Sequence, residues 1–353
     1  IMLGIWYLGP MLGFAKQDPE VVSLITGYSK IVTWSVLPAL WWVVLRNYVT
    51  ALAKSAIIGW VTFSGLGLNV ALNYTLIYGK FGLPALGVVG AGIGTTIVTW
   101  LMFFALAYVV LTSKALKDFR PRIIPHHIDN ALLSEIFRLG VPISLTQVLN
   151  GAMFTVAAVI VGMISATALA AQQIIYSVIY LSLCAPGGLG EAVRVRVAYG
   201  VGLKSIDASK QSAHISFFLA GVTALMAATV IWLFPEVLVG IFLDTNDPEN
   251  LIVLQLSNEL SFYAGMFLFL EGILLVMANA VRGLRDTRAP LWISMAGYWG
   301  IGMTTGIILC FPLGYGANGL WSGMVLGVLL ADILMYWRFT NRITNARTVL
   351  NVI

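Results

Sequence analysis

Residues 256–290 read LSNELSFYAGMFLFLEGILLVMANAVRGLRDTRAP. They contain a long apolar run that is interrupted by one carboxylate, Glu271, and they end among arginines. An apolar helix of about 20 residues, rising about 1.5 Å per residue, matches a hydrocarbon core of roughly 30 Å, so this stretch predicts a transmembrane helix. Glu271 precedes Arg282 by eleven residues, which places it about 16 Å from the charged end, near the bilayer midplane. Because a charge costs several kcal/mol at that depth, Glu271 is the first functional candidate.

The composition of the whole chain supports a polytopic helical membrane protein. Hydrophobic residues make up 59% of it, charged residues only 10%, and the mean hydropathy is +0.91. The net charge of +5 comes from cations in short gaps between apolar runs, which favours membrane orientation over nucleic-acid binding. Cys184 and Cys310 lie inside apolar runs, where we expect packing residues rather than a disulfide or a metal site.

Hydropathy predicts nine complete spans and one short remnant. The remnant, residues 1–14, would be only about 21 Å long and is too short to cross a bilayer. The nine spans are expected at 22–45, 56–79, 88–111, 141–164, 167–190, 212–234, 256–280, 290–312 and 317–337. The predicted fold class is therefore all-α.

The chain is predicted to contain a duplicated unit. An Asp-Pro-Glu tripeptide occurs at 18–20 and again at 247–249, an offset of 229, and three glycines recur at the same offset. A long polar connection, residues 112–138, separates the two copies; its adjacent His126 and His127 are expected to be a solvated pair and not a metal site. The repeat predicts two pseudo-symmetric bundles of six helices, the first lacking about 95 residues at its start.

These observations predict four regions and one orientation. The regions are an incomplete N-terminal bundle at 1–111, a cytoplasmic linker at 112–138, a C-terminal six-helix bundle at 139–341 and a cytoplasmic tail at 342–353. If the linker is cytoplasmic, 17 of the 20 Lys and Arg residues fall on that side, as the positive-inside rule requires. Whether the short first bundle reflects a fragment or a truncated gene is left open by the sequence.

Polar side chains at other depths are the remaining candidates. Asn150 lies eight residues after Pro142, with Gln147 one turn before it on the same face, and Asn69 and Asn73 share a face in the first bundle. Each of these amides suits either cation binding or interhelical packing. Two candidates remain: Gln172, and Asp332, which lies about 9 Å from the charged end at Arg338 and ranks second to Glu271.

Several motifs together resemble the multidrug and toxic compound extrusion family, in particular its bacterial NorM-like branch. They are LNVALNYTLIYGKFGLPALGVVGAGIGT, LGVPISLTQVLNGAMFTVAAVIVG, ALAAQQ and ANAVRGLRDTRAP, in this order. The resemblance implies two bundles of six helices around a cleft. It also implies export of organic cations in exchange for sodium ions or protons.

The resemblance also assigns expected roles to single residues. Glu271 stands where NorM-like members have an aspartate in the tenth helix, and Asn150 where many of them have a glutamate in the seventh. Asn69 matches an asparagine of the family's first-lobe cation site, and Asn73 stands where some relatives have an aspartate. The acid is thus retained at only one of these positions.

The combined expectation is a monomeric, cation-coupled multidrug antiporter of the bacterial inner membrane that works by alternating access. Its partners would be organic cation drugs, a coupling H⁺ or Na⁺, and membrane lipids, with no other cofactor. Phe267 and Tyr298 would offer aromatic surface to a cationic drug, beside Gln147 and Gln172. We see no catalytic motif and so expect no enzyme; the alternatives are a flippase for lipid-linked oligosaccharides, or a non-functional fragment.

Overall fold

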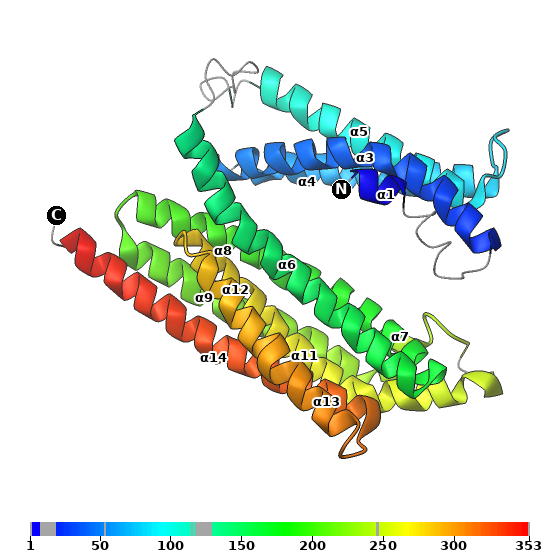
Figure 1. Cartoon of the computed structure of the whole chain (residues 1–353). Helices are drawn as coiled ribbons and strands as arrows, with labels where there is room; N and C mark the ends of the chain where they lie inside the picture. The colour runs from blue at the N-terminus through cyan, green and yellow to red at the C-terminus, as the bar shows by residue number, and fades with distance from the viewer. Residues whose placement is uncertain are drawn as a thin grey trace. The chain divides into compact units, whose positions relative to one another are not determined.

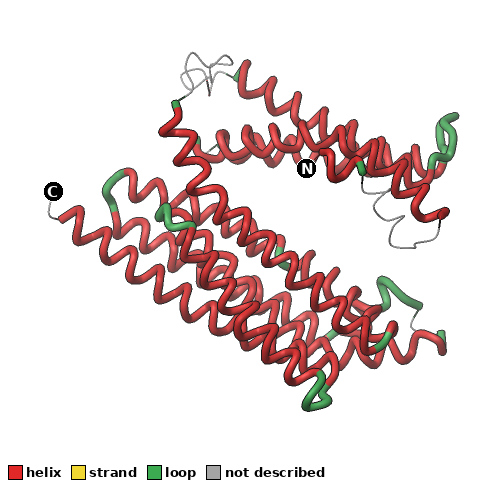
Figure 2. The backbone as a smooth tube through the Cα atoms, viewed as in Figure 1, coloured by secondary structure: helices red, strands yellow, loops and turns green. Residues whose placement is uncertain are grey.

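The computed structural model describes residues 2–7, 19–52, 54–113, 116, 129–244 and 247–351. The predicted His126–His127 pair lies outside these ranges. All regular elements within them are helices, and Figure 2 shows no strand in the part of the chain that is drawn as described. The helices form two compact units, Ile1–His126 and His127–Ile353, which are considered in turn.

Nine helical segments of the described residues are long and apolar enough to cross a membrane. They coincide with the nine predicted spans, so the all-α, polytopic fold class is confirmed. Several helices extend beyond the apolar stretch: the fourth segment begins at Asn130 instead of 141, and the fifth runs from Ala166 to Gly202. Hydropathy marks only the part of a helix that matches the hydrocarbon core, and helical hydrogen bonding continues into the polar flanks.

The first unit contains α1 (Met2–Trp6), α3 (Pro19–Ala51), α4 (Ser55–Tyr78) and α5 (Gly87–Thr112). Helix α5 packs along both α3 and α4, as Figure 1 shows. Two side chains of α5 hydrogen-bond to the backbone of α3: Thr96 Oγ1 donates to the Ile31 carbonyl at 3.3 Å, and Trp100 Nε1 to the Trp34 carbonyl at 3.2 Å. These bonds fix the register of the two apolar helices.

The second unit is larger. Its elements are α6 (Asn130–Ile164), α7 (Ala166–Ser182), α8 (Cys184–Gly202), α9 (Ile206–Leu233), α10 (Pro235–Val239), the short 3₁₀ helix η2 (Pro248–Asn250), α11 (Leu251–Gly283), α12 (Arg288–Ser294), the π-helical segment η3 (Met295–Met303), α13 (Thr304–Cys310) and α14 (Gly316–Asn351). Helix α6 begins at an N-cap, Asp129, whose carboxylate accepts the backbone N–H groups of Ala131 and Leu132.

Helix α11, which contains most of the opening stretch, is the centre of the second unit. It packs against α7, α8, α9 and α14, and in Figure 1 it runs among them. Its side chains are buried on several faces, Phe267 and Leu268 completely. The exposed residues Glu259, Phe262 and Met266 recur at intervals of three and four positions, so α11 keeps one exposed face while its other faces lie in the core.

The contact between η3 and α14 is unusually close. A Cβ atom on Gly297 would lie 2.7 Å from the carbonyl oxygen of Gly327 and 2.9 Å from Cβ of Ala331. Such distances are shorter than real Cβ contacts, so only glycine allows the two backbones to approach this far. The approach brings the residues beside Gly297 up to the middle of α14.

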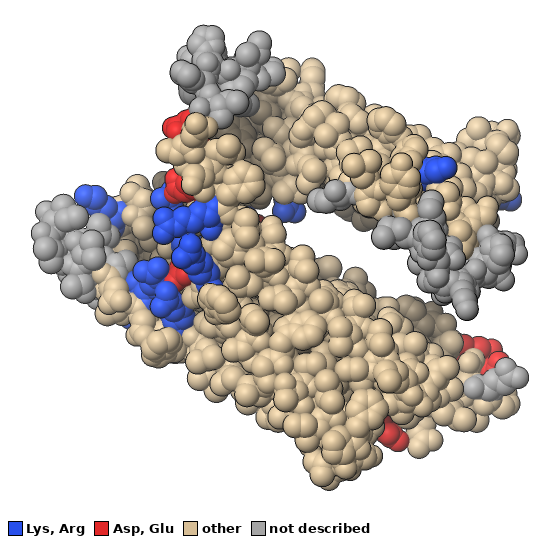
Figure 3. All heavy atoms as spheres, in the orientation of Figure 1, with Lys and Arg blue, Asp and Glu red and all other residues tan. Residues whose placement is uncertain are grey.

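Charged side chains gather at one end of the second unit. Figure 3 shows Lys and Arg where α11 ends, α12 begins and α14 continues, whereas most of the remaining visible surface of this unit carries no charge. One pair there joins Arg285 to Glu135 of α6 at 3.3 Å. This separation of a charged end from an apolar body is typical of a membrane protein.

Candidate functional site

Glu271 lies in the interior of the second unit. Glu271 is 8% exposed, and its Oε2 accepts a hydrogen bond from the hydroxyl of Tyr298 at 2.6 Å. This length is within the range of charge-assisted O–H···O⁻ bonds. The predicted acid is therefore held by a phenol from a different helix, 27 residues further along the chain.

The backbone of η3 positions this phenol. Tyr298 is 2% exposed and belongs to the π-helical segment, next to Gly297 at the contact with α14. π-Helical turns are rare and occur mostly at functional sites, because they change the direction in which side chains point. We find no pattern in residues 295–303 from which this segment could have been predicted.

A second acid, Asp332, faces the same interior from α14. It is also 8% exposed, and neither carboxylate oxygen has a hydrogen-bond partner in the described part of the chain. Asp332 is within electrostatic reach of both Glu271 and Tyr298. Two acids from two packed helices thus share one apolar interior.

Aromatic rings surround the Glu271 side of this interior. Phe267, one turn before the acid, packs edge-to-face on Phe154 of α6 and Trp321 of α14, with centroid distances of 5.8 and 5.9 Å. Tyr176 of α7 contacts the same two rings at 5.1 and 5.5 Å. Gln172 lies one turn from Tyr176, is fully buried, and makes no hydrogen bond of normal geometry among the described residues.

Two predicted amides of α6 are placed differently. Gln147 is exposed, whereas Asn150 is half-buried, and its Oδ1 is buried without a donor in the part of the chain that is described. Helices α6 and η3 are joined by the hydrogen bond from Trp299 Nε1 to the carbonyl of Leu149, at 3.2 Å. No hydrogen bond among the described side chains joins Asn150 to Glu271.

The amides of the first unit form a pair of their own. Asn73 Nδ2 donates to Asn69 Oδ1 at 3.1 Å, which confirms that the two share one helix face. The remaining oxygen, Asn73 Oδ1, is buried against Gly94 of α5 and has no donor among the described residues. Asn73 Oδ1 is therefore a buried acceptor that suits a cation or a water molecule.

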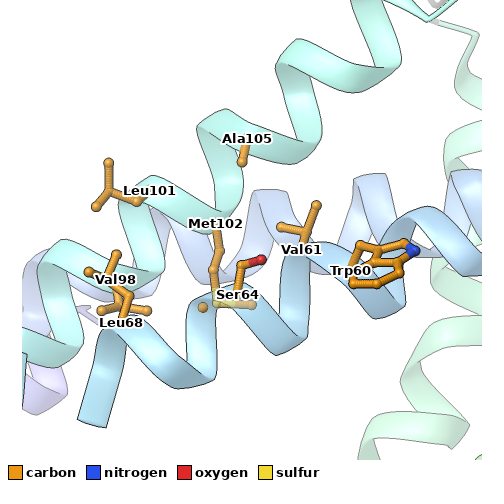
Figure 4. Close-up of a pocket in the computed structure, with 9 residues that line it drawn as sticks. Trp60, Val61, Ser64, Leu68, Val98, Leu101, Met102 and Ala105 are labelled. Atoms are coloured by element: carbon orange, nitrogen blue, oxygen red, sulfur yellow. The ribbon is translucent and has the colours of Figure 1, made fainter. Parts of the chain in front are cut away.

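A groove lies elsewhere on the first unit, between α4 and α5. It has a volume of about 270 Å³, and Figure 4 shows several of its lining side chains on these two helices. The lining residues are Trp60, Val61, Ser64, Gly65, Leu68, Val98, Leu101, Met102 and Ala105. Since Ser64 is the sole polar side chain in this lining, the groove does not resemble a cation site.

The charged end of the second unit contains an acid that our sequence analysis missed. Asp286, in the turn after α11, is 5% exposed and accepts hydrogen bonds from Arg338 at 2.7 and 2.9 Å and from Arg342 at 2.8 Å. Burial alone would raise the pKa of Asp286, but the bonds from Arg342 and Arg338 hold that pKa below its ordinary value. An aspartate among the arginines of 282–288 was the available signal.

Glu191 of α8 has a local partner. Its carboxylate forms an ion pair with Arg194, one turn later on α8, at 2.5 Å. Both side chains are partly exposed, at 45% and 30%. The pair therefore lies at a surface, and Glu191 is not part of the buried interior around Glu271.

A family model covers most of this chain. Residues 1–75 and 142–308, together more than half of the chain, match the family model MatE.

The chain belongs to the MatE family.

Two relatives from this MatE family carry similar names. Multidrug resistance protein NorM of Burkholderia vietnamiensis is 33% identical over 335 residues, covering 94% of this chain and 71% of that protein. Probable multidrug resistance protein NorM of Rhizobium meliloti is 35% identical over 335 residues, covering 95% and 72%. The MatE chain is thus placed in the NorM-like branch, as its motifs indicated.

Solved MATE structures share the fold of this chain. The eukaryotic MATE transporter AtDTX14 superposes with a TM-score of 0.83 at 19% identity, covering 99% of this chain and 77% of that one. An outward-facing multidrug resistance MATE family transporter of the MOP superfamily gives 0.82 at 19% identity, covering 98% and 78%. Because MatE proteins are transporters, this multi-pass membrane chain is a transporter and not an enzyme.

Proposed function

We propose that this transporter is a cation-coupled multidrug antiporter, which exports organic cations from the cytoplasm by alternating access in exchange for H⁺ or Na⁺. The observation that carries the proposal is the buried Glu271 of α11, hydrogen-bonded to Tyr298. The names of the NorM relatives support drugs as the substrate class. The charged end of the second unit supports a cytoplasmic C-terminus in the bacterial inner membrane.

The coupling follows from the energetics of a buried carboxylate. An ionised group in an apolar interior costs several kcal/mol unless a positive charge compensates it. A proton, a sodium ion or an organic cation can each compensate Glu271, but they compete for it. Binding of the inorganic ion from outside therefore releases the drug, and release of the ion inside restores the site for the next drug.

Further groups are proposed to assist the two kinds of ligand. Asn150 and Asn73 each hold a buried oxygen without a donor in the described part of the chain, which suits a cation ligand, and Asn69 is bonded to Asn73. For the drug we propose contacts with exposed Gln147 and with the aromatic cluster around Phe267. Since Phe267 is fully buried, drug binding requires the helices around it to separate.

Removing the charge of Glu271 tests the proposal. In vesicles that contain the protein, Glu271→Gln is expected to abolish ethidium transport against a gradient, because a neutral amide cannot exchange cations. Glu271→Asp is expected to keep much of it. Imposing a proton gradient and a sodium gradient separately identifies the coupling ion.

A second carboxylate on α11 provides the matched control. Glu259 lies twelve residues before Glu271 and is exposed, next to Gln255. Glu259→Gln changes the charge of α11 by the same amount and is expected to leave transport intact. Concentrative ethidium transport by a well-expressed Glu271→Gln variant would refute the proposal.

A further inference from the structure

Asp332 is an acid whose burial is not compensated. It lies in the middle of α14, is 92% buried as its 8% exposure indicates, and has no donor at either carboxylate oxygen in the described part of the chain. Burying an ionised carboxylate without a partner costs several kcal/mol. The acid must therefore bind a proton or another cation for most of the time.

The packing of η3 on α14 places Asp332 beside the site already described. Gly297 lies against Ala331, the residue before Asp332, and Tyr298, the residue after Gly297, donates its hydroxyl to Glu271. Glu271, Tyr298 and Asp332 therefore lie on three elements that pack together, α11, η3 and α14. Both acids are within electrostatic reach of each other.

No arginine among the described residues pairs with Asp332. Arg338 and Arg342 of the same helix bind Asp286. Arg282 of α11 has its Nε buried and unpaired in the described part of the chain, and no ion pair there joins it to Asp332. Helices α6, α9, α12 and α13 also pack against α14. Among the described residues, no ion pair joins Asp332 to the titratable groups of these helices. These groups include Glu135, Arg138, Lys210, His214, Arg288 and Cys310.

We propose that Asp332 is a second cation-binding group of the second unit, which binds a proton or a small monovalent metal ion and is coupled to Glu271 through the shared interior around Tyr298. The second unit then binds two positive charges instead of one. This inference deepens the proposed function, and it rests on that function only for the identity of the ion that transport uses.

The two acids influence each other by simple electrostatics. Two unit charges about 10 Å apart, at an effective dielectric constant of about 20, change a binding constant by roughly tenfold. At a pH at which Asp332 is ionised, Asp332→Asn is therefore expected to weaken the binding of a cation to Glu271 by roughly tenfold without abolishing it. Glu271→Gln is expected to weaken binding to Asp332 by a similar factor.

Infrared difference spectroscopy of the purified chain tests the inference without requiring transport. A protonated carboxylic acid has a C=O stretching band that disappears when a metal ion displaces the proton. The wild type is expected to show two such bands that respond to NaCl or to a rise in pH. Asp332→Asn is expected to remove one of them and Glu271→Gln the other, while Asp332→Glu keeps both.

Two spectroscopic results would overturn the inference. One is an Asp332→Asn spectrum identical to that of the wild type, and the other is an Asp332 band that neither pH nor NaCl changes, which would mean a permanently protonated structural group. The thermal midpoint of Asp332→Asn is expected to be unchanged or higher, because no hydrogen bond is lost; a large decrease would also indicate a structural role. Failure of the transport proposal would appear separately, as ethidium transport by Glu271→Gln.

Discussion

Replacing Asp286 by alanine is expected to destabilise the second unit substantially. The carboxylate lies in the turn between α11 and α12 and connects it to two arginines of α14. Its Oδ2 accepts three hydrogen bonds from the guanidinium groups, and its Oδ1 accepts the backbone N–H of Ala289 at 3.2 Å. Asp286→Ala removes all four bonds together and leaves both cations without their partner.

The expected loss can be worked out from burial. Breaking a fully buried ion pair costs about 3–5 kcal/mol, but the arginine side chains are 34% and 48% exposed and regain hydration when Asp286 is removed. The loss is therefore about 2–3 kcal/mol, within the range for hydrogen bonds to charged groups. For a unit of this size it corresponds to a thermal midpoint about 5–10 °C lower.

The measurement is thermal unfolding of the purified protein, followed by intrinsic tryptophan fluorescence. Glu135→Ala is the matched control, because Glu135 pairs with Arg285 at 3.3 Å while these side chains are 45% and 79% exposed. Exposed pairs contribute about 0–1 kcal/mol, so this variant should unfold close to the wild type. If Asp286→Ala and Glu135→Ala lower the thermal midpoint equally, the buried ion pairs of Asp286 with Arg338 and Arg342 do not stabilise the second unit more than an exposed pair does.

Three further outcomes follow from the structure. The pKa of Asp286 is lowered in the folded state, so its carboxylate stabilises the protein at pH values above its ordinary pKa and loses this effect as the pH falls toward the folded-state pKa. The difference in thermal midpoint between the wild type and Asp286→Asn should therefore shrink below about pH 4. A difference that stays constant with pH would contradict this. Gly297→Leu should destabilise the second unit by at least about 1–3 kcal/mol, because the new side chain overlaps the Gly327 carbonyl. Gly300→Ala is the control and should not, since an added Cβ atom there lies 3.8 Å from its nearest neighbour. Equal thermal midpoints for the two variants would argue against close packing at Gly297. Asp129→Ala removes the N-cap of α6 and should lower the stability of that helix end by about 1 kcal/mol. Proteolysis near residue 130 should then be faster, while the rest of the second unit stays protected. An unchanged cleavage rate would exclude a capping role.

Local sequence determined where the helices lie and which acid of the opening stretch lies in the middle of its apolar run. The length of an apolar run and the depth of Glu271 within it depend only on residues adjacent in the chain, because the bilayer sets the required length. The shared face of Asn69 and Asn73 was predictable for the same reason, since residues four apart are neighbours on any helix. The motifs also indicated the family.

Tertiary packing decided what these residues contact. Tyr298 binds Glu271 across 27 residues and Arg338 binds Asp286 across 52, and neither pairing follows from helical periodicity, which relates residues only a few positions apart. The π-helical turn and the close contact at Gly297 set the direction of the phenol and the depth of Asp332. Helix packing is driven by the fit of whole surfaces, so the partner of a buried acid emerges only when all the neighbouring helices are in place.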